Sequence, residues 1–267
     1  MDIGIDSLYK YIDLQEDDVV LYLGGRIDDD NLYPKEYRKY LNSKIKELNP
    51  SKIICHTHWY AKKYYDGGVL DESTKIDMIL VQYHDFKDGT LQTIDPVDYN
   101  GDHRSYIKAW VDKNPDMIYA MYLCGNNLVE SPKTVEVDDS WFNEDYDSTN
   151  IKCFYFLRGY FPDDLMQEAK KETINATDGF AVITHLVEAG CKNLNIVGFT
   201  AFGSGEDQSY FTAYGLSDSR FAGKKYFDIK TSECQRVEAD ILKNYVEQKK
   251  INNLEDYDEL KRHLKKG

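Results

Sequence analysis

Short apolar runs alternate with segments of helical spacing along the 267 residues of this chain. Val19–Leu23 is apolar throughout and ends at a pair of glycines, which predicts a buried strand followed by a turn. After Pro34, the segment 35–48 carries apolar residues at positions 37, 41, 45 and 48, the spacing of an amphipathic helix. Further strands are predicted at 52–55, 77–82, 117–123, 153–157 and 194–198, and further helices at 105–110, 177–189 and 234–247.

Strands that are apolar on both faces are typical of a parallel sheet covered by helices on each side. We therefore predict an α/β fold, in which residues 1–267 form a single Rossmann-like domain with a mainly parallel, twisted sheet and helices on both faces. In such sheets ligands bind beyond the carboxyl ends of the strands. The residues that directly follow strands are therefore the first candidates for a functional site.

The charge balance bears on the class of partner. Lys and Arg total 33 and Asp and Glu total 47, which gives a formal net charge of -14. An acidic surface repels phosphate backbones and anionic membranes, so nucleic acid is not an expected partner. A local basic cleft within that surface would still admit one.

The sequence also predicts a compartment. No apolar run approaches the roughly 18 residues of a membrane span, and the first residues lack the basic and apolar regions of a signal peptide. The five cysteines are scattered without a CxxC pair, as expected for free thiols in a reducing compartment. We therefore expect a cytoplasmic protein, in a bacterial or virus-infected cell as readily as in any other.

Two loops that follow predicted strands carry candidate site residues. Gly24 and Gly25 let a backbone pass close to a ligand and Arg26 is suited to pair with phosphate, although the glycines equally fit a plain tight turn. His56 and His58 stand two residues apart on a segment expected to be extended, so both side chains point to one side. There they would line a ligand cleft, share a metal ion or simply pack. No other histidine has metal-ligand spacing, so no metal site is predicted.

The predicted helix 177–189 begins with residues suited to an anionic ligand. Thr177 and Asp178 offer side-chain acceptors at the helix start, where free backbone N–H groups and the helix dipole favour negative charge. Gly179 removes a side chain at the point where a ligand or a strand would approach, and Phe180 follows it.

This segment resembles the small sialylmotif of the eukaryotic-type sialyltransferases, glycosyltransferase family 29. That motif reads roughly Pro-Ser-Thr-Gly-Phe, a helix, and then Cys-x-x-Val-x-x-Tyr-Gly-Phe. The chain has Ala-Thr-Asp-Gly-Phe at 176–180 and Cys-x-x-Leu-x-x-Val-Gly-Phe at 191–199. The resemblance implies that Thr177, Asp178, Gly179 and Phe180 contact the sugar donor, a cytidine monophosphate sugar. It also implies a variant GT-A fold and an inverting, metal-independent transfer without a further cofactor.

Two weaker similarities lie nearer the C-terminus. Lys-Tyr-Phe-Asp at 225–228 resembles the family motif His-Tyr-x-Asp, which assigns Tyr226 and Asp228 to the site. Glu238 resembles the glutamate of the last motif, His-x4-Glu, but Glu233 stands at the position of the histidine that serves as catalytic base. The base is therefore expected to be Glu233, with Asp228 or His58 as alternatives.

The sequence thus predicts a transferase that moves a sugar from a nucleotide-sugar donor to the hydroxyl of an acceptor it does not identify. Arg26, Tyr226 and the helix start would stabilise the departing nucleotide phosphate. Two other functions stay open: a protein that binds a nucleotide or glycan without catalysis, and a metal-dependent hydrolase that uses His56 and His58.

Overall fold

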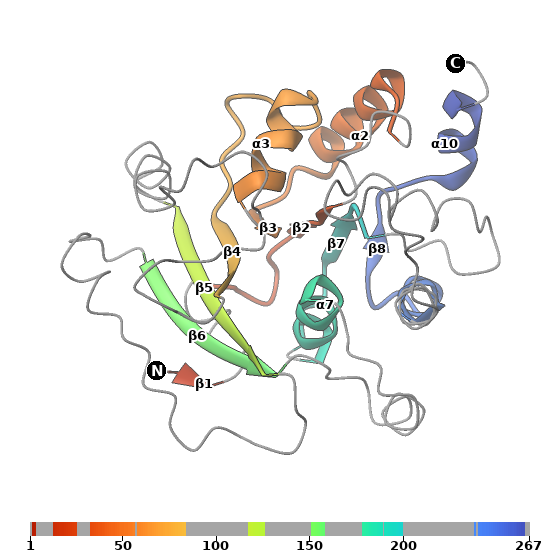
Figure 1. Ribbon diagram of the computed structural model, residues 1–267. Coiled ribbons are helices and arrows are strands. Elements are labelled where there is room, and N and C mark those ends of the chain that lie inside the picture. The colour runs from red at the N-terminus through yellow and green to blue at the C-terminus, as the bar shows by residue number, and fades with distance from the viewer. Residues whose placement is uncertain are drawn as a thin grey trace, which may run out of the picture.

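The computed structural model describes residues 2–3, 13–25, 33–56, 58–83, 117–125, 151–157, 178–188, 190–199, 238 and 240–264 (Figure 1). Eight strands of these residues form one sheet: β1 (Asp2–Ile3), β2 (Val20–Leu23), β3 (Lys52–His56), β4 (Met78–Tyr83), β5 (Ile118–Gly125), β6 (Ile151–Leu157), β7 (Leu194–Val197) and β8 (Asn252–Asn253). Each neighbouring pair in this sheet is parallel. The predicted α/β fold with a parallel sheet is therefore confirmed.

The order of the strands reverses beside β2. The sheet runs β1-β6-β5-β4-β3-β2-β7-β8, so the chain adds strands outward from β2 to β6 and then returns to place β7 on the other side of β2. Leu23 pairs with Cys55 of β3 on one side and with Val197 of β7 on the other. In doubly wound sheets a ligand-binding crevice lies at such a reversal, beyond the carboxyl ends of the two central strands.

Helices cover both faces of the sheet (Figure 1). Helices α2 (Lys35–Leu48), α3 (His58–Asp66) and α10 (Tyr257–Leu264) pack on the face to which Leu21 and Leu23 of β2 point. Helix α7 (Asp178–Glu188) and the helical residues 240–247 pack on the opposite face, against Val20 and Tyr22. Successive side chains of β2 therefore point alternately into two separate cores. Because both faces of the strand are buried, its sequence is apolar without interruption.

Several predicted elements occur where the apolar pattern placed them. The helix at 35–48 has the bounds predicted for it, and Tyr37, Leu41 and Ile45 form its buried face. The helix predicted to start at 177 is described from Asp178 onward. The helix predicted at 105–110 and the start of the one predicted at 234–247 lie outside the described residues.

One local prediction is wrong. The segment from His56 to His58 was expected to be extended, but β3 ends at His56 and His58 is the first residue of α3. Helix α3 lacks a clear signal in the sequence, because its buried positions Ala61 and Tyr64 are a small residue and a tyrosine rather than an aliphatic stripe.

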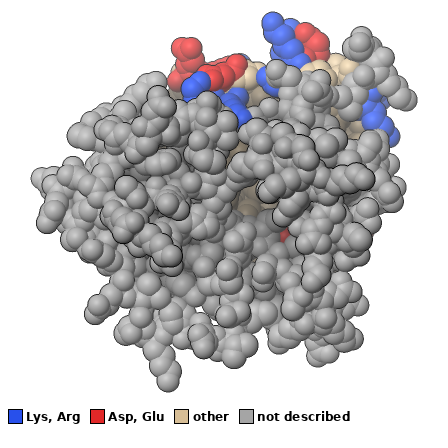
Figure 2. All heavy atoms as spheres, in the orientation of Figure 1, with Lys and Arg blue, Asp and Glu red and all other residues tan. Residues whose placement is uncertain are grey.

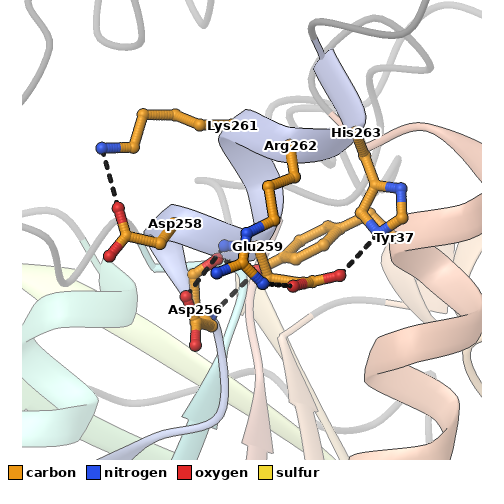
Figure 3. Close-up of polar contacts among 7 residues, drawn as sticks. All are labelled: Tyr37, Asp256, Asp258, Glu259, Lys261, Arg262 and His263. Atoms are coloured by element: carbon orange, nitrogen blue, oxygen red, sulfur yellow. Dashed lines mark hydrogen bonds and ion pairs between the residues drawn. The ribbon is translucent and has the colours of Figure 1, made fainter.

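The C-terminal helix α10 packs against α2 and is fixed at its start by Asp256 (Figure 3). The Asp256 carboxylate accepts the backbone N–H of Glu259 at 2.9 Å, and the backbone N–H of Asp256 donates to the Tyr37 hydroxyl of α2 at 3.0 Å. Glu259 in turn pairs with Arg262 at 2.7 Å. Acidic residues in the first turn and basic residues in the last complement the helix dipole. This docking holds the preceding residue, Glu255, close to the end of β7.

Charged side chains of the described residues mix at the surface. Figure 2 shows basic and acidic atoms interspersed along the upper edge, where Figure 1 places α2, α3 and α10. Exposed pairs such as Lys39–Glu36 and Lys261–Asp258 lie at 2.9 and 3.0 Å, and such solvated pairs contribute little to stability. None of the described helices has the length and apolarity that crossing a bilayer requires.

Candidate functional site

The candidate site lies at the strand reversal, where three strands end and one helix begins. Gly24 and Gly25 follow β2, Gly198 and Phe199 follow β7, and His56 ends β3. The first residues of α7 border the same place, because Gly179 lies against Phe199. We call this region the switch-point crevice.

The glycines of the crevice allow a close approach of backbone and ring. A Cβ atom at Gly24 would lie 2.6 Å from Cζ of Phe199 and 2.7 Å from the carbonyl oxygen of Gly198. A Cβ atom at Gly179 would lie 2.6 Å from Cε1 of the same ring. The Phe199 ring therefore packs between the loop after β2 and the start of α7, and only glycine fits at both positions without displacing it.

Gly198 shapes the turn after β7. Its φ of 83° lies in the left-handed region that favours glycine, and a Cβ atom there would lie 2.7 Å from the Tyr64 hydroxyl. That hydroxyl lies 2.9 Å from the Gly24 carbonyl and 3.1 Å from the Val197 carbonyl, the two strand ends beside the crevice. Tyr64 thus ties β2 to β7 from the side of α3.

The buried side chain of Glu255 forms a hydrogen bond with the same turn. Glu255 is 6% exposed, and its Oε2 accepts the backbone N–H of Gly198 at 3.0 Å. Its Oε1 accepts a short hydrogen bond from the hydroxyl of Tyr33, which is fully buried. Hydrogen bonds to a charged acceptor are stronger than neutral ones, so Glu255 anchors the end of β7 to the segment before α10.

Aromatic side chains line the crevice beside the glycines. The Tyr22 hydroxyl lies 2.8 Å from Nδ1 of His56, and the rings of Tyr22 and Phe199 are 4.7 Å apart. The His56 ring stacks at 25° to that of Tyr60, with 6.5 Å between centroids. A Cβ atom at Gly25 would collide with the Tyr60 ring. Tyr22, His56, Tyr60 and Phe199 thus pack on one another and on the glycines at this end of the sheet.

The structure brings together part of the predicted site. Gly24, Gly25, His56 and Gly179 all border the switch-point crevice. The Phe180 side chain is 2% exposed and belongs to the core beneath α7, which leaves only its backbone for a ligand. Asp178 and His58 are the first residues of α7 and α3. The remaining predicted site residues lie outside the described part of the chain: Arg26, Thr177, Tyr226, Asp228 and Glu233.

Sequence reasoning missed Tyr22, Tyr60, Tyr64 and Glu255. Tyr22 was identified only as part of an apolar strand, although an aromatic hydroxyl one residue before the strand end carried a weak signal. Glu255 joins Gly198 across 57 residues and Tyr33 across 222, and no local pattern reveals contacts of that range.

A metal centre finds no support in the described residues. Among them no three His, Cys, Asp or Glu side chains are grouped closely enough to hold a metal ion. Cys55 is a buried cysteine, and burial raises the pKa of its thiol well above the ordinary value. The thiolate that binds metals or attacks substrates is therefore disfavoured at Cys55.

A hollow of about 730 Å³ lies between α2, residues 243–247 and α10. Lys44, Lys243 and Lys261 line it together with Glu247 and Asp258. The mixed signs favour neither an anion nor a cation, and the residues that line this groove include none of those predicted for the site.

Comparison of the chain with protein-family models, with curated proteins and with solved structures finds no match.

Proposed function

We propose that this chain is a nucleotide-sugar transferase of Rossmann-like fold that binds its donor in the switch-point crevice. The observation that carries the proposal is the reversal of strand order between β2 and β7, because doubly wound sheets bind nucleotides at that position. The similarity of residues 176–199 to the small sialylmotif supports a cytidine monophosphate sugar as the donor.

The described residues suggest how the donor would be held. The start of α7 presents first-turn N–H groups and the positive end of a helix dipole, which suit a phosphate. Glycine at positions 24 and 25 lets the rings of Phe199 and Tyr60 lie against the loop beside it. The half-buried ring of Tyr60 beside Gly25 offers a surface on which a nucleobase would stack.

The transfer follows from the chemistry of such a donor. The acceptor hydroxyl attacks the anomeric carbon while the bond from that carbon to the phosphate oxygen breaks, which inverts the configuration. A base removes the hydroxyl proton, and the nucleotide leaves with the bonding electron pair. We assign the base to Glu233, with Asp228 and His58 as alternatives, and the reaction needs no metal ion or further cofactor.

A second candidate function is nucleotide binding without transfer. It is favoured by one observation, the glutamate at position 233 where the resembling family has its histidine base. Such a protein would bind the nucleotide in the same crevice and would neither hydrolyse nor transfer the sugar of a bound donor.

Thermal unfolding with CMP, UDP, GDP, ADP, zinc and manganese tests the proposal. A ligand at 100 times its Kd stabilises the folded state by about 2.7 kcal/mol, which is about 5 °C for a chain of this size. We expect CMP to raise the Tm. A rise with UDP or GDP instead would change the donor, and a rise with metals alone would contradict the transferase. Release of sugar from a CMP-sugar separates transfer from simple binding.

Substitutions at the two ends of α7 locate the site. Gly179→Val pushes a side chain into the Phe199 ring at the crevice, whereas Gly190→Ala adds a methyl group where nothing lies within 4 Å. We expect Gly179→Val to abolish the Tm rise with CMP. Gly190→Ala, strained by its φ of 93°, should lower the Tm of the free protein but keep the rise. An equal rise in both variants would place the donor elsewhere.

A further inference from the structure

The C-terminal helix α10 and the turn after β7 share an anchor, the side chain of Glu255. This residue directly precedes Asp256, which caps the helix, and its carboxylate accepts the backbone N–H of Gly198 at 3.0 Å. The same carboxylate accepts the hydroxyl of Tyr33, which lies just before α2. A displacement of the segment that carries Glu255 would therefore be felt at the turn that borders the switch-point crevice.

Helix α10 is short and buries little of its described surface. Leu260 is fully buried, whereas the other described side chains of this helix are exposed or half-buried. At its start the Asp256 backbone N–H donates to the Tyr37 hydroxyl of α2 at 3.0 Å (Figure 3). The hollow of about 730 Å³ borders the helix and residues 253–256 on one side. An eight-residue helix depends on docking for its stability, and segments that bury little apolar surface open before the whole protein unfolds.

We propose that residues 255–264 form a C-terminal latch on the switch-point crevice. When α10 undocks from α2, Glu255 leaves its place and releases the backbone N–H of Gly198, so the turn after β7 is held only while the latch is closed. The latch belongs to the free protein and requires no ligand. Its effect on a ligand in the crevice rests on the proposed function.

Tyr64 sets the boundary of this opening. Its hydroxyl bonds to the carbonyls of Gly24 and Val197, and it belongs to α3 rather than to the latch. The backbone N–H of Gly24 also donates to the Val197 carbonyl at 2.8 Å. The ends of β2 and β7 therefore stay paired when the latch opens, and the Gly24 amide reports the unfolding of the sheet instead.

Amide hydrogen exchange in the free protein measures the opening. Asp256→Ala removes the carboxylate that accepts the Glu259 N–H at 2.9 Å, and it leaves the side chain of Glu255 in place. We expect the amides of Leu260, which donates to the Asp256 carbonyl, and of Gly198 to exchange about 5-fold faster, the usual loss when an N-cap residue becomes alanine. The Gly24 amide should keep its rate.

The matched control is Asp258→Ala, which removes an exposed carboxylate from the same helical turn. Asp258 pairs with Lys261 at 3.0 Å at the surface, so its loss should change these rates by about 2-fold or less. A second variant, Leu260→Ala, weakens the docking from the buried side and should accelerate the Gly198 amide more than Asp256→Ala does.

Two results would overturn the latch. If the Leu260 amide exchanges faster in Asp256→Ala while the Gly198 amide keeps its rate, Glu255 does not couple the helix to the turn. If the Gly24 amide is accelerated as much as the Gly198 amide, α10 opens only when the whole protein unfolds.

CMP extends the test to the ligand. A ligand at 100 times its Kd that binds only the closed form slows this exchange about 100-fold. We expect CMP to slow the Leu260 amide as much as the Gly198 amide, although Leu260 lies in α10. A rise in Tm with CMP that leaves the Leu260 exchange rate unchanged would overturn the role of the latch toward the ligand. If CMP changes neither the Tm nor the exchange, the proposed function is wrong, while Asp256→Ala still decides whether the latch exists.

Discussion

Replacing Gly198 by alanine tests how the turn after β7 is built. The φ of Gly198 is 83°, and the new Cβ atom would lie 2.7 Å from the Tyr64 hydroxyl and 2.9 Å from the Gly24 carbonyl oxygen. Gly190→Ala is the matched control, because Gly190 has a φ of 93° and its Cβ atom would meet nothing within 4 Å. Both variants carry the same backbone strain, and only one carries the collision.

The two effects separate by magnitude. A left-handed conformation costs an L-residue about 1–2 kcal/mol, which sets the loss expected for Gly190→Ala. Gly198→Ala adds the loss of a tyrosine hydrogen bond, about 1 kcal/mol, and the strain of overpacking, about 1–3 kcal/mol. We therefore expect Gly198→Ala to reduce the free energy of unfolding by about 3–6 kcal/mol, a large part of the 5–15 kcal/mol typical of a folded protein.

Urea unfolding of the wild type and both variants measures the difference, provided that the m-values agree. The double variant Gly198→Ala/Tyr64→Phe adds a second check, because removing the hydroxyl relieves the collision and should recover part of the loss. Equal losses for the Gly198 and Gly190 variants would refute the argument that the Tyr64 contact, rather than backbone conformation, makes glycine necessary at position 198.

Two further predictions concern buried and half-buried polar groups. Tyr33→Phe should reduce the free energy of unfolding by about 1.5–3 kcal/mol, because its hydroxyl donates to the charged carboxylate of Glu255, whereas Tyr37→Phe, which loses bonds to backbone groups, should cost about 0.5–1.5 kcal/mol. Equal losses in denaturant titrations would argue against a charged acceptor. Burial raises the pKa of the Asp77 carboxyl and outweighs the hydrogen bond from the Ile53 N–H, which lowers it. The folded state therefore holds the proton of this carboxyl more tightly than the unfolded chain does. The wild type should therefore gain stability relative to Asp77→Asn as the pH falls from 7 toward 4, and unfolding titrations that show the opposite slope would contradict this sign.

The sequence predicted those elements whose signal is local. The strands at the centre of the sheet are uninterrupted apolar runs, and α2 has an apolar stripe at helical spacing, so both could be read from neighbouring residues. Helix α10 is not predicted, because Leu260 is the fully buried residue among its described side chains and one leucine makes no apolar stripe. Its stability depends on the Asp256 cap and on the charges at its ends. Such a helix forms through docking, which a periodicity search does not detect.

The candidate site divides in the same way. Gly24 and Gly25 are predicted as site residues because they follow a strand, and Gly179 because it lies at the start of a helix. Each of these positions can be recognised from adjacent residues in the sequence. The residues that give the crevice its shape come from far along the chain. Tyr64 reaches Gly24 across 40 residues and Val197 across 133. A single sequence contains no record of such contacts.

The packing of Phe199 changes how the glycines of the crevice should be interpreted. Glycine at position 24 or 179 is explained by the protein itself, since a Cβ atom at either position would meet the Phe199 ring. A substitution there moves the ring before it affects a nucleotide, so a loss of binding in such variants follows from either cause. Changes made on the ligand avoid this ambiguity, because removing the phosphate from CMP leaves the packing of the protein untouched. Comparing the binding of CMP with that of cytidine, which lacks the phosphate, therefore carries more weight for the site than any glycine variant.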